Sequence, residues 1–285
     1  MIVAVAAGAL VGVTVVVALA ATVQLSAGFG FGLAAVPLLS IVLDAHDAVV
    51  VALTLATFTN GYQAWTGRRD ADRGVAGRLL AGAAVGLPVG LVVFLRVDDR
   101  VLGAIIGVAV LVAVVVIALG LDLRHAGPGL DVAGGVLSGA MTMSAGVNGP
   151  PLVFVLQARH FEPLRFRATI TSVFFVLDVV SVVVFTATGA LDAEVLPAVA
   201  AALPGLALGA AAGVAVIAWS RAQPVADGAK AGLALDRIGA NWTLMVDQCL
   251  PYLFGVKIFV QDPVTLGHGP WPAPWPLQVI QGAAA

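Results

Sequence analysis

Long apolar segments alternate with short polar loops along the chain. Residues 1–43 carry no charged side chain, and most of the later uncharged runs approach the roughly 20 residues that a helix needs to cross a bilayer. These later runs are residues 48–67, 79–95, 101–121, 132–158 and 195–220, together with 168–191, in which Asp178 is the one charged position. Backbone groups that face lipid must form hydrogen bonds within their own segment, so the runs are predicted to be helices. The predicted fold is an all-α, polytopic membrane protein of about seven to eight membrane segments.

The composition adds to this picture mainly by excluding other classes of protein. Hydrophobic residues make up 60% of the 285 residues and charged residues 11%, whereas about a quarter of a soluble domain is charged. The formal net charge of −2 offers no basic surface for nucleic acid. The single cysteine, Cys249, excludes internal disulfides and paired-cysteine metal sites, and the four histidines lie in loops or in the C-terminal tail. Because the apolar runs hold no nucleophile–base pair and no cluster of metal ligands, we expect neither an enzyme nor a bound metal or cofactor.

A glycine-rich motif occurs twice, 118 residues apart. It reads SAGFGFGLAAVPLL from Ser26 and SAGVNGPPLVFVL from Ser144. The sequence therefore predicts two membrane repeats, residues 1–121 and residues 122–221.

The charges of the loops differ in sign between the two halves. Segment 68–78 carries four Arg and two Asp, a net +2, and its counterpart carries Asp192 and Glu194, a net −2. Conversely, segment 44–47 carries two Asp, and its counterpart 157–167 carries three Arg against one Glu. Cytoplasmic loops are enriched in Lys and Arg, so corresponding loops of the two repeats are predicted to lie on opposite sides of the membrane. Such inverted-topology repeats are common in secondary transporters, and chance composition of short loops is the alternative.

Tracing the chain from this rule predicts hairpins that enter and leave the membrane on one side. With 68–78 on the inside, residues 121–131 and 157–167 fall on the inside as well. Residues 132–158 are then long enough to form a re-entrant hairpin that breaks in the middle. By the repeat, residues 14–43 form the corresponding hairpin from the outside.

The two motifs predict where these hairpins break. Glycine permits non-helical backbone and close approach of a ligand, and proline suits the first turn of a helix. The second half-helices are expected to begin around residues 31 and 150, with free N–H groups and positive dipole ends that face the space between the repeats. Two such ends could bind a small anion without Lys or Arg. The candidate substrate-binding residues are Ser26, Gly28, Gly30, Gly32, Ser144, Gly146, Asn148, Gly149, Pro150 and Pro151. The alternative is that these glycines only allow close packing of helices.

Asp178 is the only acidic residue deep inside an apolar run. Burial disfavours the charged form of a carboxyl group, so Asp178 could carry a proton at neutral pH. An ionisable residue within a membrane segment indicates function, which here suggests proton coupling or gating. At the repeat offset Asn60 corresponds to Asp178 and would be its uncharged partner. The alternative is a structural acid that forms hydrogen bonds with a neighbouring helix.

The doubled motif resembles the sulfite exporter TauE/SafE family of bacterial and archaeal membrane proteins. The sequence FRAT at Phe166–Thr169, soon after a short basic loop, is similar to that family as well, and the likeness extends over about residues 5–220. The resemblance implies a permease of about eight segments, built from two repeats, that moves sulfite, sulfonates or other small sulfur-containing or organic anions across the cytoplasmic membrane. It implies a small anion and membrane lipid as partners, and it leaves homo-oligomerisation open. An integral membrane enzyme or sensor and a passive anion channel are the alternative functions.

The C-terminal tail departs from this pattern. The counterpart of the apolar span 101–121 would be about residues 221–241, which read RAQPVADGAKAGLALDRIGAN. Inserting the charges of this segment would be costly, so the last span of the second repeat is expected to be missing. We predict that residues 222–285 form an atypical, poorly ordered tail that arises from an altered reading frame and is no second domain.

Overall fold

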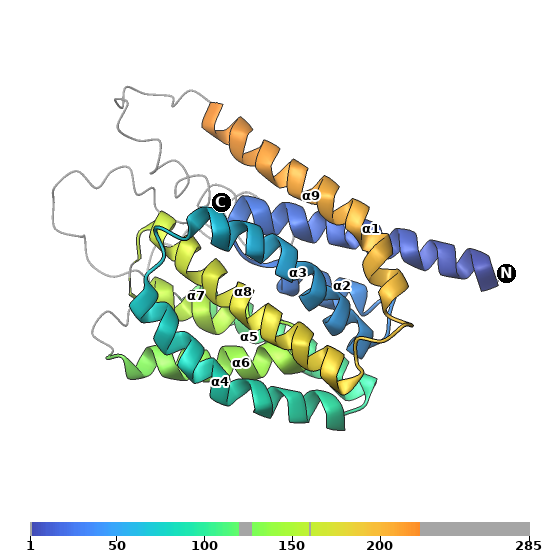
Figure 1. Ribbon diagram of the computed structural model, residues 1–285, viewed down its shortest axis with the longest axis horizontal. Helices are drawn as coiled ribbons and strands as arrows, with labels where there is room; N and C mark the ends of the chain where they lie inside the picture. Colours follow the sequence, from blue (N-terminus) through green and yellow to red (C-terminus); the bar gives the residue numbers. More distant parts are fainter. Residues whose placement is uncertain (1, 120–126, 160, 223–285) are drawn as a thin grey trace, which may run out of the picture. The chain divides into compact units, whose positions relative to one another are not determined.

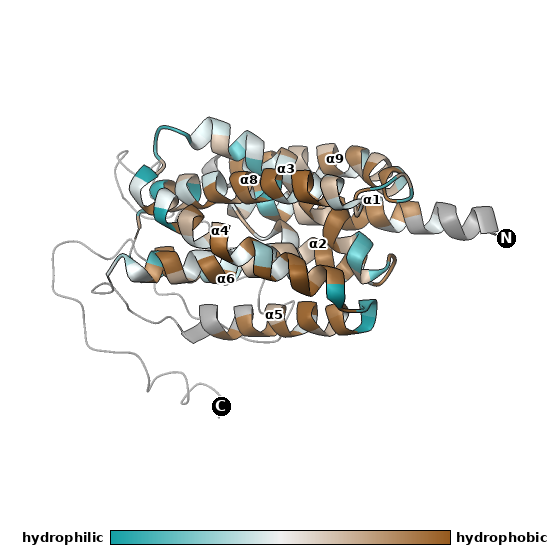
Figure 2. Cartoon of the chain, turned by 60° about the horizontal axis from the view of Figure 1, so that its bottom comes forward, coloured by the Kyte–Doolittle hydropathy of each residue, from teal (hydrophilic) through white to brown (hydrophobic). Residues whose placement is uncertain are grey.

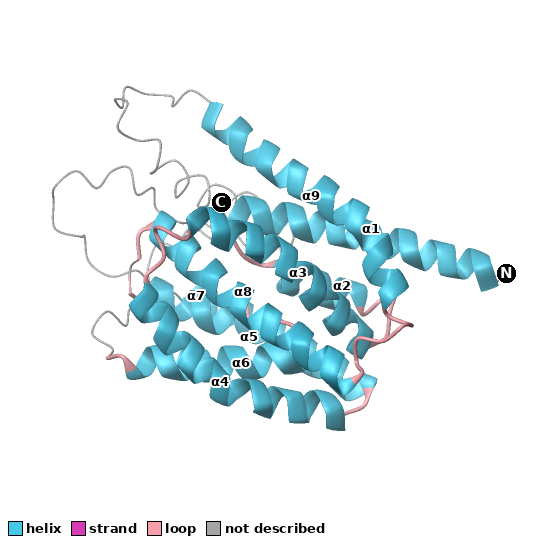
Figure 3. Cartoon of the chain, viewed as in Figure 1, coloured by secondary structure: helices cyan, strands magenta, loops and turns pink. Residues whose placement is uncertain are grey.

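The computed structural model describes residues 2–119, 127–159 and 161–222 of the chain. Within these ranges the chain is helical, with short loops and no strand (Figure 1, Figure 3). The helices are α1 (Ile2–Ala27), α2 (Phe31–Leu39), α3 (Ala45–Gly67), α4 (Arg73–Arg96), α5 (Asp99–Leu119), α6 (Gly129–Ala145), α7 (Gly149–Ala158), α8 (Pro163–Thr188) and α9 (Leu196–Ala222). The tail predicted over 222–285 lies outside the described residues, apart from Ala222, so its prediction is not tested.

Among the described residues, four helices contain a segment that is long and apolar enough to cross a membrane. These segments are Leu10–Ala27 in α1, Arg73–Arg96 in α4, Leu164–Thr188 in α8 and Leu196–Trp219 in α9. Figure 2 shows that the hydrophilic residues gather mainly at helix ends and in loops. Val85 on α4 is 62% exposed, whereas Asp178 on α8 is fully buried. This distribution is expected of a membrane protein, because lipid favours apolar side chains on the outside and ionisable ones inside the bundle. The all-α prediction is confirmed, and the larger number of spans stays a prediction.

Two pairs of helices pack in parallel through rows of glycines. The rows are Gly82, Gly86 and Gly90 on α4, which face α6, and Gly205, Gly209 and Gly213 on α9, which face α1. A Cβ added at Gly86 would overlap the carbonyl oxygen of Val136 and lie 2.8 Å from the amide nitrogen of Ala140. Glycines four residues apart lie on one face of a helix and let two backbones meet, so these six serve helix packing.

This packing gives a first testable prediction, for the variant Gly86→Ala. We expect it to lower the free energy of unfolding by about 1–3 kcal/mol, because the added methyl group meets backbone that cannot move aside. Gly77 on the same helix has no heavy atom within 4 Å of an added Cβ, so Gly77→Ala is the matched control. The measurement is thermal unfolding of the purified protein in detergent. Equal melting temperatures of the two variants would contradict the packing.

The chain between Asp131 and Arg159 folds into a helical hairpin, as the sequence trace predicts. Arg159 Nε donates to Asp131 Oδ1 at 2.7 Å, so the start of α6 and the end of α7 lie together. α1 and α2 form a second hairpin, in which a Cβ added at Gly12 would lie 3.6 Å from the side chain of Val42. α1 runs unbroken from Ile2, so this hairpin has the longer first arm.

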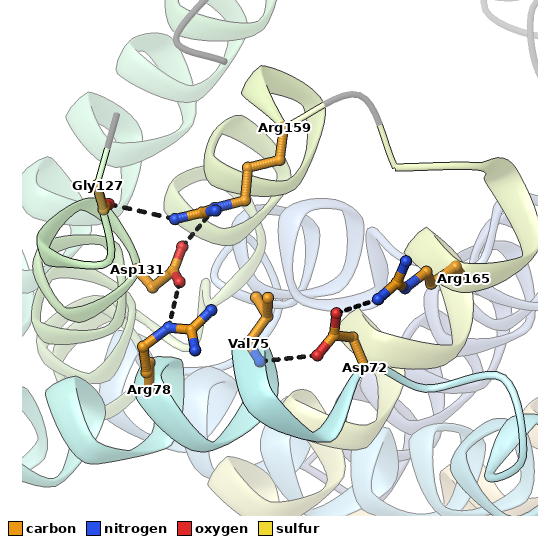
Figure 4. Close-up of polar contacts among 7 residues, drawn as sticks. All are labelled: Asp72, Val75, Arg78, Gly127, Asp131, Arg159 and Arg165. Carbon is orange, nitrogen blue, oxygen red and sulfur yellow. Dashed lines mark hydrogen bonds and ion pairs between the residues drawn. The ribbon is translucent and has the colours of Figure 1, made fainter. Parts of the chain in front are cut away.

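Arginine–aspartate pairs join the loops at one end of the bundle. Arg78 Nε donates to Asp131 Oδ2 at 2.7 Å, and Figure 4 shows Asp131 between the guanidinium groups of Arg78 and Arg159. Arg165 at the start of α8 pairs with Asp72, the residue before α4 (Figure 4). These pairs connect the loops that the charge rule places on one side of the membrane.

A separate polar cluster joins the loops at the opposite end. His46 Nδ1 lies 2.7 Å from Asp99 Oδ1, and His46 Nε2 lies 2.8 Å from the main-chain oxygen of Phe94. α3 begins in this cluster and α4 ends in it. The end of α3 and the start of α4 lie beside the arginine pairs. The grouping of the loops therefore agrees with the predicted trace.

Candidate functional site

The first helix break lies between α1 and α2. Gly28 and Gly30 have φ values of 92° and 105°, which residues with a Cβ rarely adopt. α2 begins at Phe31, as predicted, and Gly30 has no side chain with which to cap it. Instead, the N–H of Phe31 donates to Oε1 of Gln24 at 3.0 Å. Gln24 is 1% exposed, so a buried amide caps the first turn of α2.

The second break lies between α6 and α7. Gly146 ends α6 with φ 65°, and its N–H and that of Val147 donate back to the main-chain oxygens of Thr142 and Met141 in α6. α7 begins at Gly149, one residue before the predicted start, and Pro150 and Pro151 occupy its first turn. Because proline has no N–H, Gly149 supplies the only main-chain donor among the first three residues of α7.

The two breaks contact each other. A Cβ added at Gly32 would overlap the carbonyl oxygen of Gly146 and lie 3.3 Å from its carbonyl carbon. A Cβ added at Gly149 would lie 3.7 Å from Leu33 Cδ1 and 3.9 Å from the ring of Phe29. The two glycine-rich motifs, far apart in sequence, thus meet through their main chains, as the hypothesis of a shared site requires.

Asp178 lies in a buried network of amide side chains. Its Oδ2 accepts a hydrogen bond from Asn60 Nδ2 at 2.7 Å, and its Oδ1 accepts one from Asn148 Nδ2 at 3.1 Å. Asn60 is 2% exposed and Asn148 8% exposed. The structure therefore brings the predicted pair of Asn60 and Asp178 together, and Asn148 joins them from the second break.

The same network reaches the first break. Gln24 Nε2 donates to Asn60 Oδ1 at 2.6 Å and to Gln63 Oε1 at 2.9 Å, and Gln63 Nε2 donates to the main-chain oxygen of Gln24 at 3.2 Å. On the other side, Ser138 Oγ donates to the main-chain oxygen of Asn148 at 2.8 Å. One unbroken set of hydrogen bonds therefore connects the start of α2 with the carboxyl group of Asp178.

The two motif serines form hydrogen bonds within their own helices. Ser26 Oγ donates to the main-chain oxygen of Thr22 at 2.7 Å, and Ser144 Oγ donates to that of Ala140 at 2.7 Å. Such bonds occupy the single hydroxyl hydrogen of each serine. In this arrangement neither serine hydroxyl points a hydrogen at the space between the breaks.

Arg167 lies against the first break, in a site that was predicted without Lys or Arg. Its Nη2 donates to the main-chain oxygen of Leu25 at 2.6 Å. A Cβ added at Gly28 would lie 2.8 Å from Arg167 Cγ. The guanidinium group thus caps the last turn of α1, where a positive charge also meets the negative end of the helix dipole.

Sequence reasoning missed Gln24 and Gln63 as members of the network. A signal for Gln24 was available, because it is the only amide side chain in residues 1–43. An amide within an apolar run needs hydrogen-bond partners from another segment. Gln63 gave no comparable signal, because it lies one turn from a polar loop, where an amide can bond to water.

The model of the sulfite exporter TauE/SafE family matches residues 13–225, more than half of the chain. The chain belongs to the sulfite exporter TauE/SafE family. The resemblance inferred from the doubled motif is confirmed, and both breaks and Asp178 lie within the matched residues. Membership makes the chain a multi-pass membrane protein of a family of sulfite and anion exporters, which are transporters and not enzymes. Comparison with curated proteins found no match, nor did comparison with solved structures.

Proposed function

We propose that this TauE/SafE chain is a secondary transporter that moves a small anion across the cytoplasmic membrane. Sulfite, a sulfonate or another small sulfur-containing or organic anion is the expected substrate. The observation that carries the proposal is the contact between the two helix breaks, in which Gly32 of α2 lies directly against Gly146. Irregular backbone at membrane depth is tolerated where it is buried in protein or lines a cavity, and in transporters it forms the substrate site.

The proposal includes two inverted repeats of about seven to eight spans in total. It is supported by the bounds of α2 (Phe31–Leu39) and α7 (Gly149–Ala158), and of α3 and α8, which begin 118 residues apart in each pair. It is also supported by the hydrogen bond between Asn60 and Asp178, which are 118 residues apart as well. A bond between equivalent positions is expected where a pseudo-twofold axis passes between them.

The anion is proposed to bind at the starts of α2 and α7. Gly149 offers a main-chain N–H at the start of α7, the N–H of Phe31 at the start of α2 is held by Gln24 Oε1, and the first turns of both helices carry partial positive charge. Asn148 and the motif glycines would surround the anion, with Ser26 and Ser144 behind them. The glycines leave room for close approach to the backbone, and Arg167 at the first break favours a negative solute electrostatically.

Asp178 is proposed to couple anion movement to a proton. For a sulfonate, which stays ionised over the whole pH range used, a pH gradient should accelerate uptake into proteoliposomes by the unaltered protein. Asp178→Asn should remove this acceleration, because asparagine cannot exchange a proton. Ser181→Ala is the control, since Ser181 is also fully buried on α8 but bonds to Leu177 of its own helix. A gradient response that survives in Asp178→Asn would contradict the coupling role.

The proposed function itself is tested by isotopic flux in proteoliposomes. Sulfite, sulfate, sulfoacetate and organic acids are compared with and without a pH gradient. A secondary transporter shows saturable flux of at least one anion and a response to the gradient, whereas a passive channel shows flux that ignores it. Absence of flux for every anion would favour the alternative of a membrane enzyme or sensor.

A further inference from the structure

The buried amides around Asp178 form one line of hydrogen bonds with a fixed direction. A main-chain N–H can only donate, so the N–H of Phe31 requires Gln24 to present Oε1 to it. Gln24 Nε2 therefore points away from Phe31 and donates to Asn60 Oδ1, and Asn60 Nδ2 donates to Asp178 Oδ2. A single backbone donor thus sets the orientation of two amide groups, and both donate toward the carboxyl group.

In this orientation the hydrogen bonds to Asp178 suit its ionised form, whereas its burial disfavours the charge. Asn60 and Asn148 each offer an N–H donor to one of its oxygens, and both are neutral. Among the described residues, the charged side chains other than Asp178 on α8 and on the helices packed against it lie in or next to the first or last two turns. These side chains are His46 and Asp47 on α3, Arg68 after α3, Arg73, Arg78 and Arg96 on α4, Asp131 on α6, Arg159 after α7, and Arg165 and Arg167 on α8. A proton on Asp178 would need a new hydrogen-bond acceptor, which neither amide presents as it stands.

We infer that Gln24 and Asn60 couple protonation of Asp178 to release of the Phe31 N–H. When Oδ2 takes a proton from water, its O–H needs an acceptor, and Asn60 provides one by turning its amide through half a turn. Asn60 Nδ2 then faces Gln24, which must turn in the same way to accept with Oε1, and Gln63 Oε1 loses its hydrogen bond from Gln24 Nε2. Gln24 Nε2 now faces the N–H of Phe31, and two donors cannot bond to each other.

The consequence is that the start of α2 gains two donors without an acceptor when Asp178 is protonated. An anion bound there would accept from the Phe31 N–H and from Gln24 Nε2. This inference rests on the proposed function, which places the anion at the starts of α2 and α7. Proton and anion would then bind together, one of each, and Gln24 would be a positioning residue that links their sites.

The test uses methanesulfonate, because it stays ionised while Asp178 titrates. Its dissociation constant is measured on the full-length protein in nanodiscs between about pH 5 and about pH 9. For the unaltered chain we expect affinity to fall about tenfold per pH unit above the titration of Asp178, as for one linked proton. Asp178→Asn should bind tightly at every pH, because its side-chain N–H donates to Asn60 as the protonated acid would.

Gln24→Met should lose the pH dependence. Methionine has no amide group to turn, so a change in the orientation of Asn60 cannot reach the N–H of Phe31. Gln63→Met is the matched control: Gln63 is 5% exposed and bonds to Gln24, but it lies beside the line from Phe31 to Asp178, so the pH dependence should persist. Asn60→Leu breaks the same line of hydrogen bonds between Gln24 and Asp178. It should also lose the pH dependence, and agreement between two different variants would show that the loss does not come from a folding defect in one of them.

Each remaining outcome bears on a different claim. If Gln24→Met and Asn60→Leu keep the slope of the unaltered chain, the relay through Gln24 is overturned, and Asn148 is the residue that accommodates the proton. If the unaltered chain binds methanesulfonate with a flat pH profile, the inference fails while the anion site stands. If the unaltered chain and Gln63→Met bind none at any pH, the proposed anion site fails, and the relay fails with it.

Discussion

Replacing Gly32 with alanine is expected to abolish anion transport. The new methyl group would overlap the carbonyl oxygen of Gly146 and lie 3.7 Å from the Cα of Val147. Both groups belong to the main chain of the second break, which cannot turn away as a flexible side chain can. The clash therefore separates the two breaks or distorts the turn between α6 and α7. Overpacking of this kind costs about 1–3 kcal/mol, so we also expect a lower melting temperature.

Flux in proteoliposomes and thermal unfolding in detergent together check this expectation. Gly12→Ala is the control, because a Cβ at Gly12 lies in the same hairpin but meets only the side chain of Val42, at an ordinary 3.6 Å. It should leave both flux and melting temperature unchanged. A Gly32→Ala protein that transports at the rate of Gly12→Ala would show that contact between the breaks is not needed for function.

The second large effect is expected for Asp131→Asn, a change that removes a charge with little change in size. Asp131 is fully buried and accepts from Nε of both Arg78 and Arg159, each at 2.7 Å. Without the carboxylate, the Arg159 side chain, which is 20% exposed, loses its anionic partner inside the bundle. Breaking a buried ion pair from one side costs about 3–5 kcal/mol. Because Arg78 is 39% exposed and can turn to water, we expect the lower end, about 3 kcal/mol.

The comparison that isolates burial is Asp72→Asn at the same end of the bundle. Asp72 pairs with Arg165, whose side chain is 54% exposed, and it caps α4 by accepting from the N–H of Val75. That hydrogen bond, followed by the one from Arg165, holds the pKa of Asp72 below its ordinary value. Asparagine caps a helix about as well as aspartate, so only an exposed ion pair is lost, worth about 0–1 kcal/mol. Similar losses of stability in Asp72→Asn and Asp131→Asn, measured by chemical unfolding, would contradict the argument.

Several features of the site were predictable because they depend on local chemistry. Glycine and proline act on their own backbone, so the starts of α2 at Phe31 and α7 at Gly149 agree with predicted starts near 31 and 150. Repetition in the sequence paired Asn60 with Asp178, and the two side chains are in fact hydrogen-bonded. The function of that pair stays a prediction, as do the two repeat boundaries.

Other features could not be predicted, because they depend on which segments face each other. The serines of the two motifs resemble ligands in sequence, yet Ser26 and Ser144 bond within their own helices. Glycines of packed helices, such as Gly86, cannot be told by sequence from the exposed Gly77. Gln24 stands alone in an apolar run, and nothing local assigns it to Asn60 or to the start of α2.

The sequence by itself determined that this is a helical membrane protein, where its helices break and which end of the bundle is rich in arginine. Hydrophobicity, backbone conformation and loop charge are properties of single residues or short segments, so they can be read without a fold. Only the tertiary structure decided that the two breaks touch and that Gln24, Asn60 and Asp178 form one line of hydrogen bonds. Hydrogen bonds between buried side chains join distant segments, and the packing of whole helices selects their partners.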